Sequence, residues 1–259
     1  AKAVAEEALG RDDRIISVSS SYSDGDNFGY RITSNGFEGE TKSSWYSLYA
    51  EVAIKGEGEA RPSAGWYESS LYFDKLVKEG VGQKALERVL RKVGQRKAKS
   101  GKYTMVVDPM NVSQLLSPLV DALYGSSLQQ KNSFLLDKLN EKVLADKMTL
   151  IDEPHLQQAS GARYFDSEGV ATERRPVFEN GVLKTYFIDT YNARKMGVSP
   201  TINSPSILVM QTGLKDLDGL VAGVDHGILV TGFNGGNCNS STGDFSYGIE
   251  GFLIENGKL

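Results

Sequence analysis

Apolar residues occupy every second position from Tyr46 to Ile54. The alternating apolar residues are Tyr46, Leu48, Ala50, Val52 and Ile54. Because successive side chains of a strand point to opposite faces, this period of two predicts a half-buried strand. Strand-like runs also occur at 14–21 and 28–34, and the second of these ends in an Asn35-Gly36 turn.

A helical spacing follows a Gly- and Glu-rich break at 55–60. Apolar residues recur at intervals of three and four from Val81 to Val93, which predicts an amphipathic helix that ends at Gly94. A shorter helical signal at 3–9 is closed by Gly10.

The polar segment 94–101 is rich in small and charged residues, as linkers between domains are. We therefore expect a first domain at 1–98 and a second at 99–259. The second domain begins with a predicted buried strand at 103–107, followed by Asp108-Pro109, where Asp can cap a helix and Pro can occupy its first turn.

Helical spacing then predicts one helix over 112–123, kinked or shortened at Pro118, and a second helix over 134–143. A strand at 148–151 follows. The remainder is mostly β: Asn180-Gly181 lies between two apolar runs, which is a strong hairpin signal. Further strands are predicted at 206–211, 227–231 and 245–255, the first two of them buried.

The turn at 178–183 has a near copy at 254–259, where the sequence stops. A hairpin turn without a return strand leaves an unpaired edge, so we expect the natural protein to continue beyond residue 259. The residue at position 1 is not Met, which points the same way at the other end. The elements together predict a mixed α/β (α+β) fold with mixed and antiparallel sheets, flanking helices and a β-rich C-terminal domain.

Composition excludes several classes of protein. The 259 residues are 40% hydrophobic, with a formal net charge of −4 and a pI near 5.4. These values fit a globular protein and lack the basic excess of a dedicated nucleic-acid binder. Cys238 is the single cysteine and cannot form an internal disulfide. The two histidines, His155 and His226, lie too far apart in sequence for a two-histidine zinc helix.

Local charge is less even than the total. Between Lys75 and Lys102 there are ten basic residues and two acidic ones. This basic segment allows two interpretations: contact with phosphate groups, or the solvated face of a helix.

The usual catalytic constellations are mostly missing. A nucleophile built on Cys238 would need His155 or His226 beside it in space. Two acid pairs occur, at 152–153 and at Asp166/Glu168. Because Arg163, Arg174 and Arg175 lie close to them in sequence, surface ion pairs are a simpler interpretation than acid–base catalysis.

Two segments stand out as candidate sites. One is the charged stretch 165–175, which contains Asp166, Glu168 and Arg174. The other is 231–248, with five glycines in eighteen residues, for which a peptide-presenting loop and an ordinary long surface loop are both open. The residues of interest in the second segment are Asn234, Gly235, Gly236, Asn237, Cys238 and Asp244.

Several short motifs occur in an order and spacing that is specific when taken together. They are Asp12-Asp-Arg14, Ser34-Asn-Gly-Phe37, Val81-Gly82, Arg88, Ser133-Phe-Leu-Leu136, Phe165-Asp-Ser-Glu-Gly-Val170, Glu179-Asn-Gly-Val-Leu183, Tyr191-Asn-Ala-Arg-Lys195 and Thr242-Gly-Asp-Phe-Ser246. On these residues the chain resembles, essentially end to end, the TldD/PmbA or modulator-of-gyrase family, and specifically its PmbA (TldE) branch.

The resemblance implies a cytoplasmic protein with a middle α/β domain and a β-rich C-terminal domain. The two branches of the family form a dimer that acts as a peptidase on unfolded or modified peptides. In the catalytic branch, zinc is bound by a His-Glu-x-x-x-His helix and a further Cys. Here the corresponding region, 117–127, has neither His nor Glu, so the resemblance implies no zinc site and no other cofactor. Cys238 belongs to an Asn-Cys-Asn stretch of this branch and receives no ligand role.

Three functional hypotheses follow. In the first, the chain is a non-catalytic subunit that forms a peptide groove beside a catalytic TldD-type subunit or a second copy of itself. In the second, it is a regulatory binding protein, such as a modulator of DNA gyrase, without a role in proteolysis. In the third, it is a stand-alone hydrolase that uses Cys238. We expect a peptide substrate, and neither a membrane nor a nucleic acid as partner.

Overall fold

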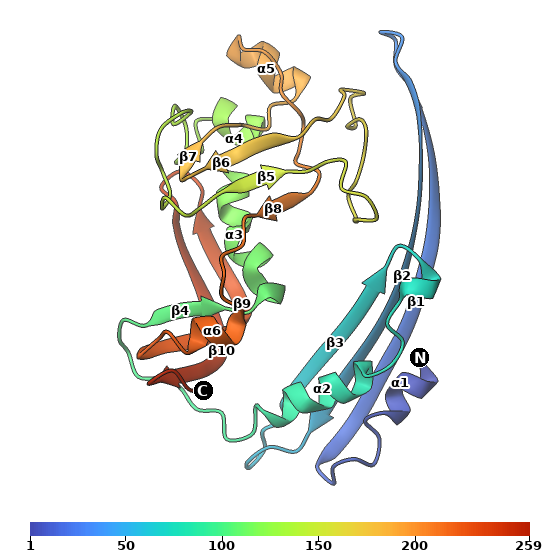
Figure 1. The fold of residues 1–259 in the computed structure, drawn as a ribbon, viewed down its shortest axis with the longest axis vertical. Coiled ribbons are helices and arrows are strands. Elements are labelled where there is room, and N and C mark those ends of the chain that lie inside the picture. The colour runs from blue at the N-terminus through green and yellow to red at the C-terminus, as the bar shows by residue number, and fades with distance from the viewer. The chain divides into compact units, whose positions relative to one another are not determined.

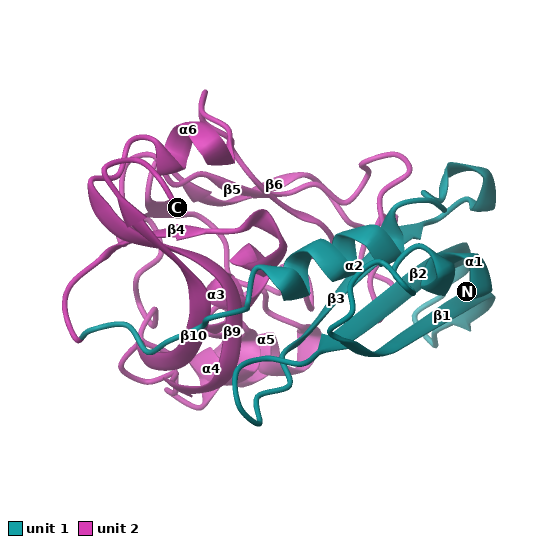
Figure 2. Cartoon of the chain, turned by 90° about the horizontal axis from the view of Figure 1, so that it is seen from below, with its two compact units in different colours: residues 1–99 teal, residues 100–259 magenta.

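A computed structural model describes all residues from Ala1 to Leu259. The chain divides into two compact units, residues 1–99 and residues 100–259, shown in different colours in Figure 2. Unit 1 has one sheet and unit 2 has two, and each unit has its own buried core. The fold is mixed α/β with antiparallel and mixed sheets, which confirms the fold class predicted from the sequence.

Unit 1 is built on a three-stranded antiparallel sheet in the order β1-β2-β3. The strands are β1 (Ile15–Ile32), β2 (Glu38–Ile54) and β3 (Ser63–Ser70). Figure 1 shows the β1–β2 hairpin extending well past the end of β3. The predicted alternation in β2 is confirmed, since Leu48, Ala50, Val52 and Ile54 are all buried. The Asn35-Gly36 turn is also confirmed, with Gly36 at φ 90°.

The two runs predicted at 14–21 and 28–34 are parts of one 18-residue strand, β1. The register with β2 continues through the polar residues between them, for example at Asp24↔Tyr46 and Asp26↔Ser44. Backbone pairing holds this part of the strand, and most of its side chains are exposed. Side-chain alternation therefore gives no signal there, which is why the sequence indicated two strands.

Two helices cover one face of this sheet. α1 (Lys2–Glu6) lies beside β1, and α2 (Val81–Leu90) packs across β2 and β3. The Glu7 carboxylate accepts hydrogen bonds from the backbone N–H groups of Gly80 (2.9 Å) and Gly82 (2.8 Å). A Cβ atom at Gly82 would lie 2.0 Å from the carbonyl oxygen of Val4, so only glycine permits this close packing.

The basic segment 75–102 includes all of α2, and several of its charges have partners within unit 1. Lys84 Nζ lies 2.9 Å from the Glu68 carboxylate. Lys84 and Arg88 also lie over the ring of Trp66, at 4.8 and 5.4 Å from its centroid. Phe73 begins a short 3-10 helix, Phe73–Lys75. Lys78 Nζ lies 3.8 Å from the centroid of its ring. These contacts favour the structural interpretation of the segment over phosphate binding.

Unit 2 contains two sheets. The first has the order β10-β9-β4, from β4 (Thr104–Val107), β9 (His226–Asn239) and β10 (Asp244–Glu255). β4 runs parallel to β9, whereas β9 and β10 are antiparallel. The prediction of a buried strand at 103–107 is wrong in part: β4 is an edge strand, and only Val106 in it is buried.

The second sheet is antiparallel, in the order β7-β6-β5-β8. Its strands are β5 (Leu150–Asp152), β6 (Arg175–Glu179), β7 (Val182–Leu183) and β8 (Leu208–Met210). The hairpin at Asn180-Gly181 is confirmed, with φ values of 51° and 78°. β8 was expected to be buried, but it is an edge strand with Val209 37% exposed.

Four short helices complete unit 2, with a 3-10 helix at Pro109–Asn111 that is capped by the side chain of Asp108 as expected. The four are α3 (Val112–Asp121), α4 (Gly125–Gln129), α5 (Thr190–Met196) and α6 (Leu217–Val221). α3 continues through Pro118. None of the chain's helices is both long and apolar enough to span a membrane.

The helix predicted over 134–143 does not form. This segment is a series of turns in which Asp137 and Asn140 have positive φ, a conformation that ends a helix. Two of its apolar residues still face inward: Leu135 is buried in the core around Phe178 and Phe187, and Leu136 packs in the cluster with Leu128. The helical spacing therefore arises because an irregular segment buries apolar residues in two different clusters.

Candidate functional site

The first candidate segment forms a closed loop around the carboxylate of Asp166, which is 3% exposed. One carboxylate oxygen accepts hydrogen bonds from the backbone N–H groups of Glu168 (2.8 Å) and Val170 (2.9 Å). The other accepts from the N–H of Asn203 at 3.1 Å. Asp166 was expected to form a surface ion pair. It is instead a buried anchor that fastens the 165–170 loop to the segment around Asn203.

The acid pair 152–153 divides between two roles. Asp152 is buried, and its carboxylate accepts from the N–H groups of Ser206 and Ile207 at 2.8 and 3.0 Å. Glu153 does form the expected exposed ion pair, with Arg174 at 2.7 Å. Arg174 therefore points to Glu153 and is not drawn into the loop of Asp166.

Arg163 and Arg175 also differ in their partners. The Arg163 guanidinium donates hydrogen bonds to the side chains and carbonyls of residues 204–206 and pairs with no acid. Arg175 pairs with Glu173 at 3.4 Å. Of these arginines, Arg174 and Arg175 bind carboxylates, whereas Arg163 binds loop carbonyls and hydroxyls.

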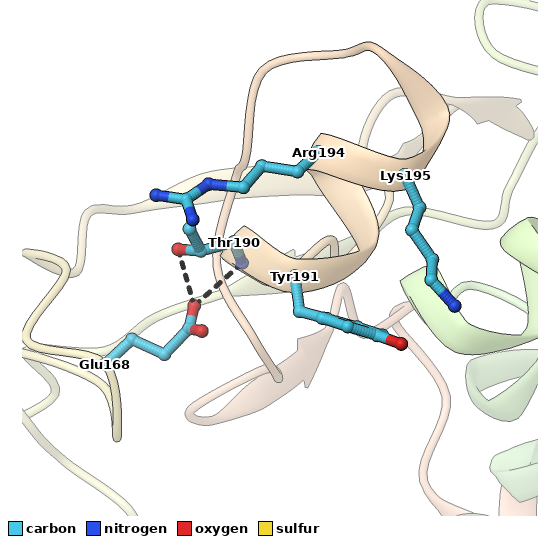
Figure 3. Close-up of a pocket in the computed structure, with 5 residues that line it drawn as sticks. All are labelled: Glu168, Thr190, Tyr191, Arg194 and Lys195. Carbon is cyan, nitrogen blue, oxygen red and sulfur yellow. Dashed lines mark hydrogen bonds between the residues drawn. The ribbon is translucent and has the colours of Figure 1, made fainter.

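Glu168 connects this loop to α5. One oxygen of its carboxylate accepts from the backbone N–H of Thr190 at 2.9 Å and from the Thr190 hydroxyl at 3.0 Å. Figure 3 shows this pair at the rim of an open pocket of about 530 Å³. The residues that line the pocket are Glu168, Thr190, Tyr191, Arg194 and Lys195.

Asp189 begins α5. Its side chain accepts from the backbone N–H of Asn192 at 2.8 Å and from the Asn192 amide nitrogen. Partial burial raises the pKa of Asp189, but the hydrogen bonds from Asn192 outweigh it, so the pKa lies below its ordinary value of 3.8. At the other end, Gly197 closes the helix in the left-handed conformation.

This pKa gives a testable pH dependence. Because the folded-state pKa of Asp189 lies below the unfolded value, its stabilising contribution is fully present above about pH 4 and is lost as pH falls through the lowered pKa. We expect Asp189→Asn, which keeps a capping side chain but does not titrate, to reduce the acid sensitivity of α5. Amide exchange of 190–196 measured from pH 5 to pH 2 checks this; an unchanged acid profile in Asp189→Asn contradicts it.

The second candidate segment, 231–248, is not a loop. Most of it belongs to the long antiparallel hairpin of β9 and β10, whose turn lies at 240–243. Gly235 and Gly236 form a bulge opposite Tyr247 and have φ values of 59° and 149°. A Cβ atom at Gly236 would lie 2.4 Å from the Tyr247 ring. The glycines therefore bend a strand and allow an aromatic ring to lie against its backbone.

The outer half of this hairpin is exposed. Asn234 to Asn239 are all exposed, including Asn237 and the free thiol of Cys238. Cys238 pairs across the hairpin with Phe245, which contacts Tyr247 at a ring distance of 5.8 Å. Asp244, at the start of β10, accepts a hydrogen bond from the Thr242 hydroxyl at 2.7 Å.

Neither histidine contacts Cys238. His226 is the first residue of β9, and at about 3.3 Å per residue the twelve positions to Cys238 put the two roughly 40 Å apart. His155 stacks on Tyr164, and its Nε2 lies 3.1 Å from the Thr172 hydroxyl. A thiol that is not hydrogen-bonded to a base lacks the usual activation of a nucleophile.

The two candidate segments connect through α4. The carbonyl of Ser240, at the hairpin turn, accepts from the N–H of Phe134 at 2.8 Å. Phe134 follows α4, and Leu128 of α4 is buried against Ile188 and Ala193, which flank and belong to α5. The hairpin turn is therefore fixed to the element that carries the pocket.

The helix that the family resemblance aligns with a zinc motif offers a poor donor set for zinc. In 117–127 the only carboxylate is Asp121, whose side chain accepts from Ser117 and whose carbonyl accepts from Ser127. Structural and catalytic zinc sites are built from His, Cys and carboxylate ligands in groups of three or four. No group of three or more His, Cys, Asp or Glu side chains in the chain is arranged to hold a metal ion. These residues do not fit zinc.

Sequence reasoning missed four of the five pocket residues: Thr190, Tyr191, Arg194 and Lys195. A signal was present. Asp189 is a helix cap, and the spacing of one aromatic and two basic residues at i, i+3 and i+4 places all three on one helix face. These three residues belong to the motif Tyr191-Asn-Ala-Arg-Lys195, to which the sequence alone assigned no site role.

Comparison with curated proteins finds relatives named for proteolysis. The chain is 34% identical to "Metalloprotease PmbA homolog" of Haemophilus influenzae, covering 97% of this chain and 57% of the relative. It is 29% identical to "Metalloprotease PmbA" of Escherichia coli O157:H7, over 98% of this chain and 58% of the relative. The chain thus spans a little over half the length of these relatives.

Two solved structures have the same fold as this chain. A crystal structure from Bacteroides thetaiotaomicron, described as a modulator of DNA gyrase, superposes with a TM-score of 0.99 at 76% identity and covers all of this chain and 59% of its own. A second one, from Thermotoga maritima and described in the same terms, gives 0.89 at 28% identity, over 99% of this chain and 62% of its own.

The match to family domains covers both units. Residues 1–93 match the PmbA/TldA metallopeptidase central domain, and residues 100–259 match the PmbA/TldA metallopeptidase C-terminal domain. The boundary between the two matches falls at the linker between the compact units. The chain belongs to the PmbA/TldD family of metallopeptidases.

Proposed function

We propose that this chain is a non-catalytic, groove-forming subunit of a TldD/PmbA-type metalloprotease assembly that degrades unfolded or modified peptides. The observation that carries the proposal is the donor-poor segment 117–127 in a chain whose relatives are metalloproteases. In this proposal a TldD-type partner in the same cytoplasm supplies the zinc and its ligands. The partner's metal then performs the hydrolysis, and this chain positions the peptide.

The β9–β10 hairpin is the proposed wall of the groove. β10 is an edge strand of 12 residues. β4 pairs with β9 only at Gly227–Val230, so the outer half of β9 also has an unpaired edge. Extended peptides bind to such edges by adding a strand, with main-chain hydrogen bonds that are independent of peptide sequence. A protease subunit that receives varied unfolded peptides needs this kind of recognition.

The proposal predicts activity only in the mixture. We expect peptidase activity on an unfolded substrate such as reduced, alkylated protein when this chain, in its full-length form, is combined with a TldD-type protein. A chelator should abolish the activity, and neither protein alone should show it. Gly236→Val, which would displace the Tyr247 ring, should lower the activity of the mixture, whereas Lys2→Gln in unit 1 serves as a matched surface control.

The alternatives give opposite results in the same assay. Activity of the isolated chain that survives a chelator and disappears in Cys238→Ala would establish the stand-alone hydrolase and refute the subunit role. If the pair forms no complex and no activity appears, a binding role outside proteolysis is favoured. Charge reversal of Arg96 and Lys97 in the basic segment then tests that role directly.

A further inference from the structure

We propose that the pocket of about 530 Å³ beside α5 binds a carboxylate group, and that in the assembly this group is the C-terminus of a peptide. The second half of the inference rests on the proposed peptide-binding function. The first half concerns the chemistry of the pocket alone and is tested on the isolated chain.

The charges of the pocket favour a singly charged anion. Arg194 and Lys195 contribute two positive charges and Glu168 one negative charge, so the lining carries a net charge of +1. Neither basic side chain forms a salt bridge with a carboxylate of this chain. The Glu168 carboxylate is directed instead to the backbone N–H and the hydroxyl of Thr190. The pocket thus offers a guanidinium that can bind a carboxylate through two parallel hydrogen bonds.

An aromatic ring lies next to one of these cations, Lys195. Tyr191 is 62% exposed, and the Lys195 ammonium lies 4.7 Å from its ring centroid. Figure 3 shows the Tyr191 ring and the Lys195 side chain extending together to one side of α5, while Arg194 extends toward Thr190 and Glu168. An apolar side chain next to a carboxylate therefore has a ring to pack on, which matches the last residue of a peptide that ends in an apolar residue.

A simpler role exists for part of this set. Basic residues in the last turn of a helix interact favourably with its dipole, and Arg194 and Lys195 both lie there in α5. That role requires neither the exposed ring of Tyr191 nor a cavity bounded by Glu168 from a different segment. The two interpretations differ in ligand binding, which the dipole interaction does not produce.

The test compares two small probes that differ in one charge. N-acetyl-phenylalanine carries a free carboxylate, and N-acetyl-phenylalaninamide does not. We expect the isolated chain to bind the acid about tenfold more tightly than the amide, measured by chemical-shift changes at 168 and 190–195 or by calorimetry. Arg194→Gln should remove this preference. Arg11→Gln, which removes an exposed guanidinium from unit 1, should leave it unchanged; circular dichroism confirms that each variant is folded.

Several outcomes overturn the inference. Equal binding of acid and amide, or the same preference in Arg194→Gln, refutes the carboxylate site. Tighter binding of inorganic phosphate than of N-acetyl-phenylalanine also refutes it. N-acetyl-Ala-Ala-Phe should bind more tightly than free phenylalanine, and the reverse order would exclude a peptide C-terminus as the source. Because these measurements need no partner protein, their failure is separate from failure of the mixed peptidase assay.

Discussion

Replacing Asp166 with alanine should lower the free energy of unfolding of unit 2 by about 3 kcal/mol. The substitution removes the acceptor of three backbone N–H groups, those of Glu168, Val170 and Asn203. Hydrogen bonds to a charged group contribute about 1.5–3 kcal/mol each, and water can replace only part of them at a side chain that is 3% exposed. Asp166→Asn should cost less, because the amide oxygen can still accept from Glu168 and Val170, and only the hydrogen bond from Asn203 is lost.

The measurement can be made specific to unit 2. Both tryptophans, Trp45 and Trp66, lie in unit 1, so their fluorescence reports the unfolding of that unit and acts as an internal control. Amide exchange at Glu168, Val170 and Asn203 reports the loop directly and should accelerate most in Asp166→Ala. Asp244→Ala is the matched control, since that carboxylate accepts from the hydroxyl of Thr242 on the exposed hairpin. Equal losses in the two variants would show that Asp166 is not the anchor described above.

Gly181→Ala should be among the most damaging substitutions in the chain, at about 3–5 kcal/mol. Gly181 has a φ of 78°, and a left-handed conformation costs alanine about 1–2 kcal/mol. A Cβ atom there would also lie 2.2 Å from the carbonyl oxygen of Leu144 and 2.7 Å from that of Ala145. The Leu144 N–H donates to the Gly181 carbonyl, and the Ala145 carbonyl accepts from the N–H of Met148, so this segment cannot move aside without loss of those hydrogen bonds.

Gly197→Ala provides the control for backbone strain. Gly197 has a similar φ of 69°, but nothing lies within 4 Å of the position of a Cβ atom. We therefore expect a loss of about 1 kcal/mol, which is the cost of the left-handed conformation alone. Thermal unfolding followed by far-ultraviolet circular dichroism measures both variants. Similar losses at the two positions would mean that the contact with Leu144 and Ala145 relaxes freely.

The elements that could be predicted from the sequence are those whose side chains or turn residues act locally. The alternation in β2 and the Asn180-Gly181 turn needed no knowledge of distant contacts. The helix prediction for 134–143 failed because apolar residues of this segment enter two different cores, which a local period cannot reveal. The loop interpretation of the outer β9–β10 hairpin failed because the glycines there form a bulge, and a glycine-rich bulge resembles a flexible loop in sequence.

The candidate site divides in the same way. Asp166 and Glu168 were identified as notable residues, but their hydrogen bonds reach Asn203 and Thr190, distant in sequence, so their roles required the structure. Arginines that lie close to acidic residues in the sequence led to a prediction of ion pairs, and this was right for Arg174 and Glu153. It was wrong for Asp166, because a buried carboxylate binds whichever backbone N–H groups the fold brings to it.

The parallel pairing of β4 with β9 has a consequence for how the protein folds. Val107 pairs with Val230, so more than a hundred residues lie between two neighbours in one sheet. The strands of unit 1, in contrast, follow one another directly along the chain. Since folding slows as contacts span longer stretches of chain, unit 1 should fold early during synthesis. In unit 2 the β10-β9-β4 sheet can form only after β9 has left the ribosome. Until then β4 is an unpaired strand, to which a chaperone could bind.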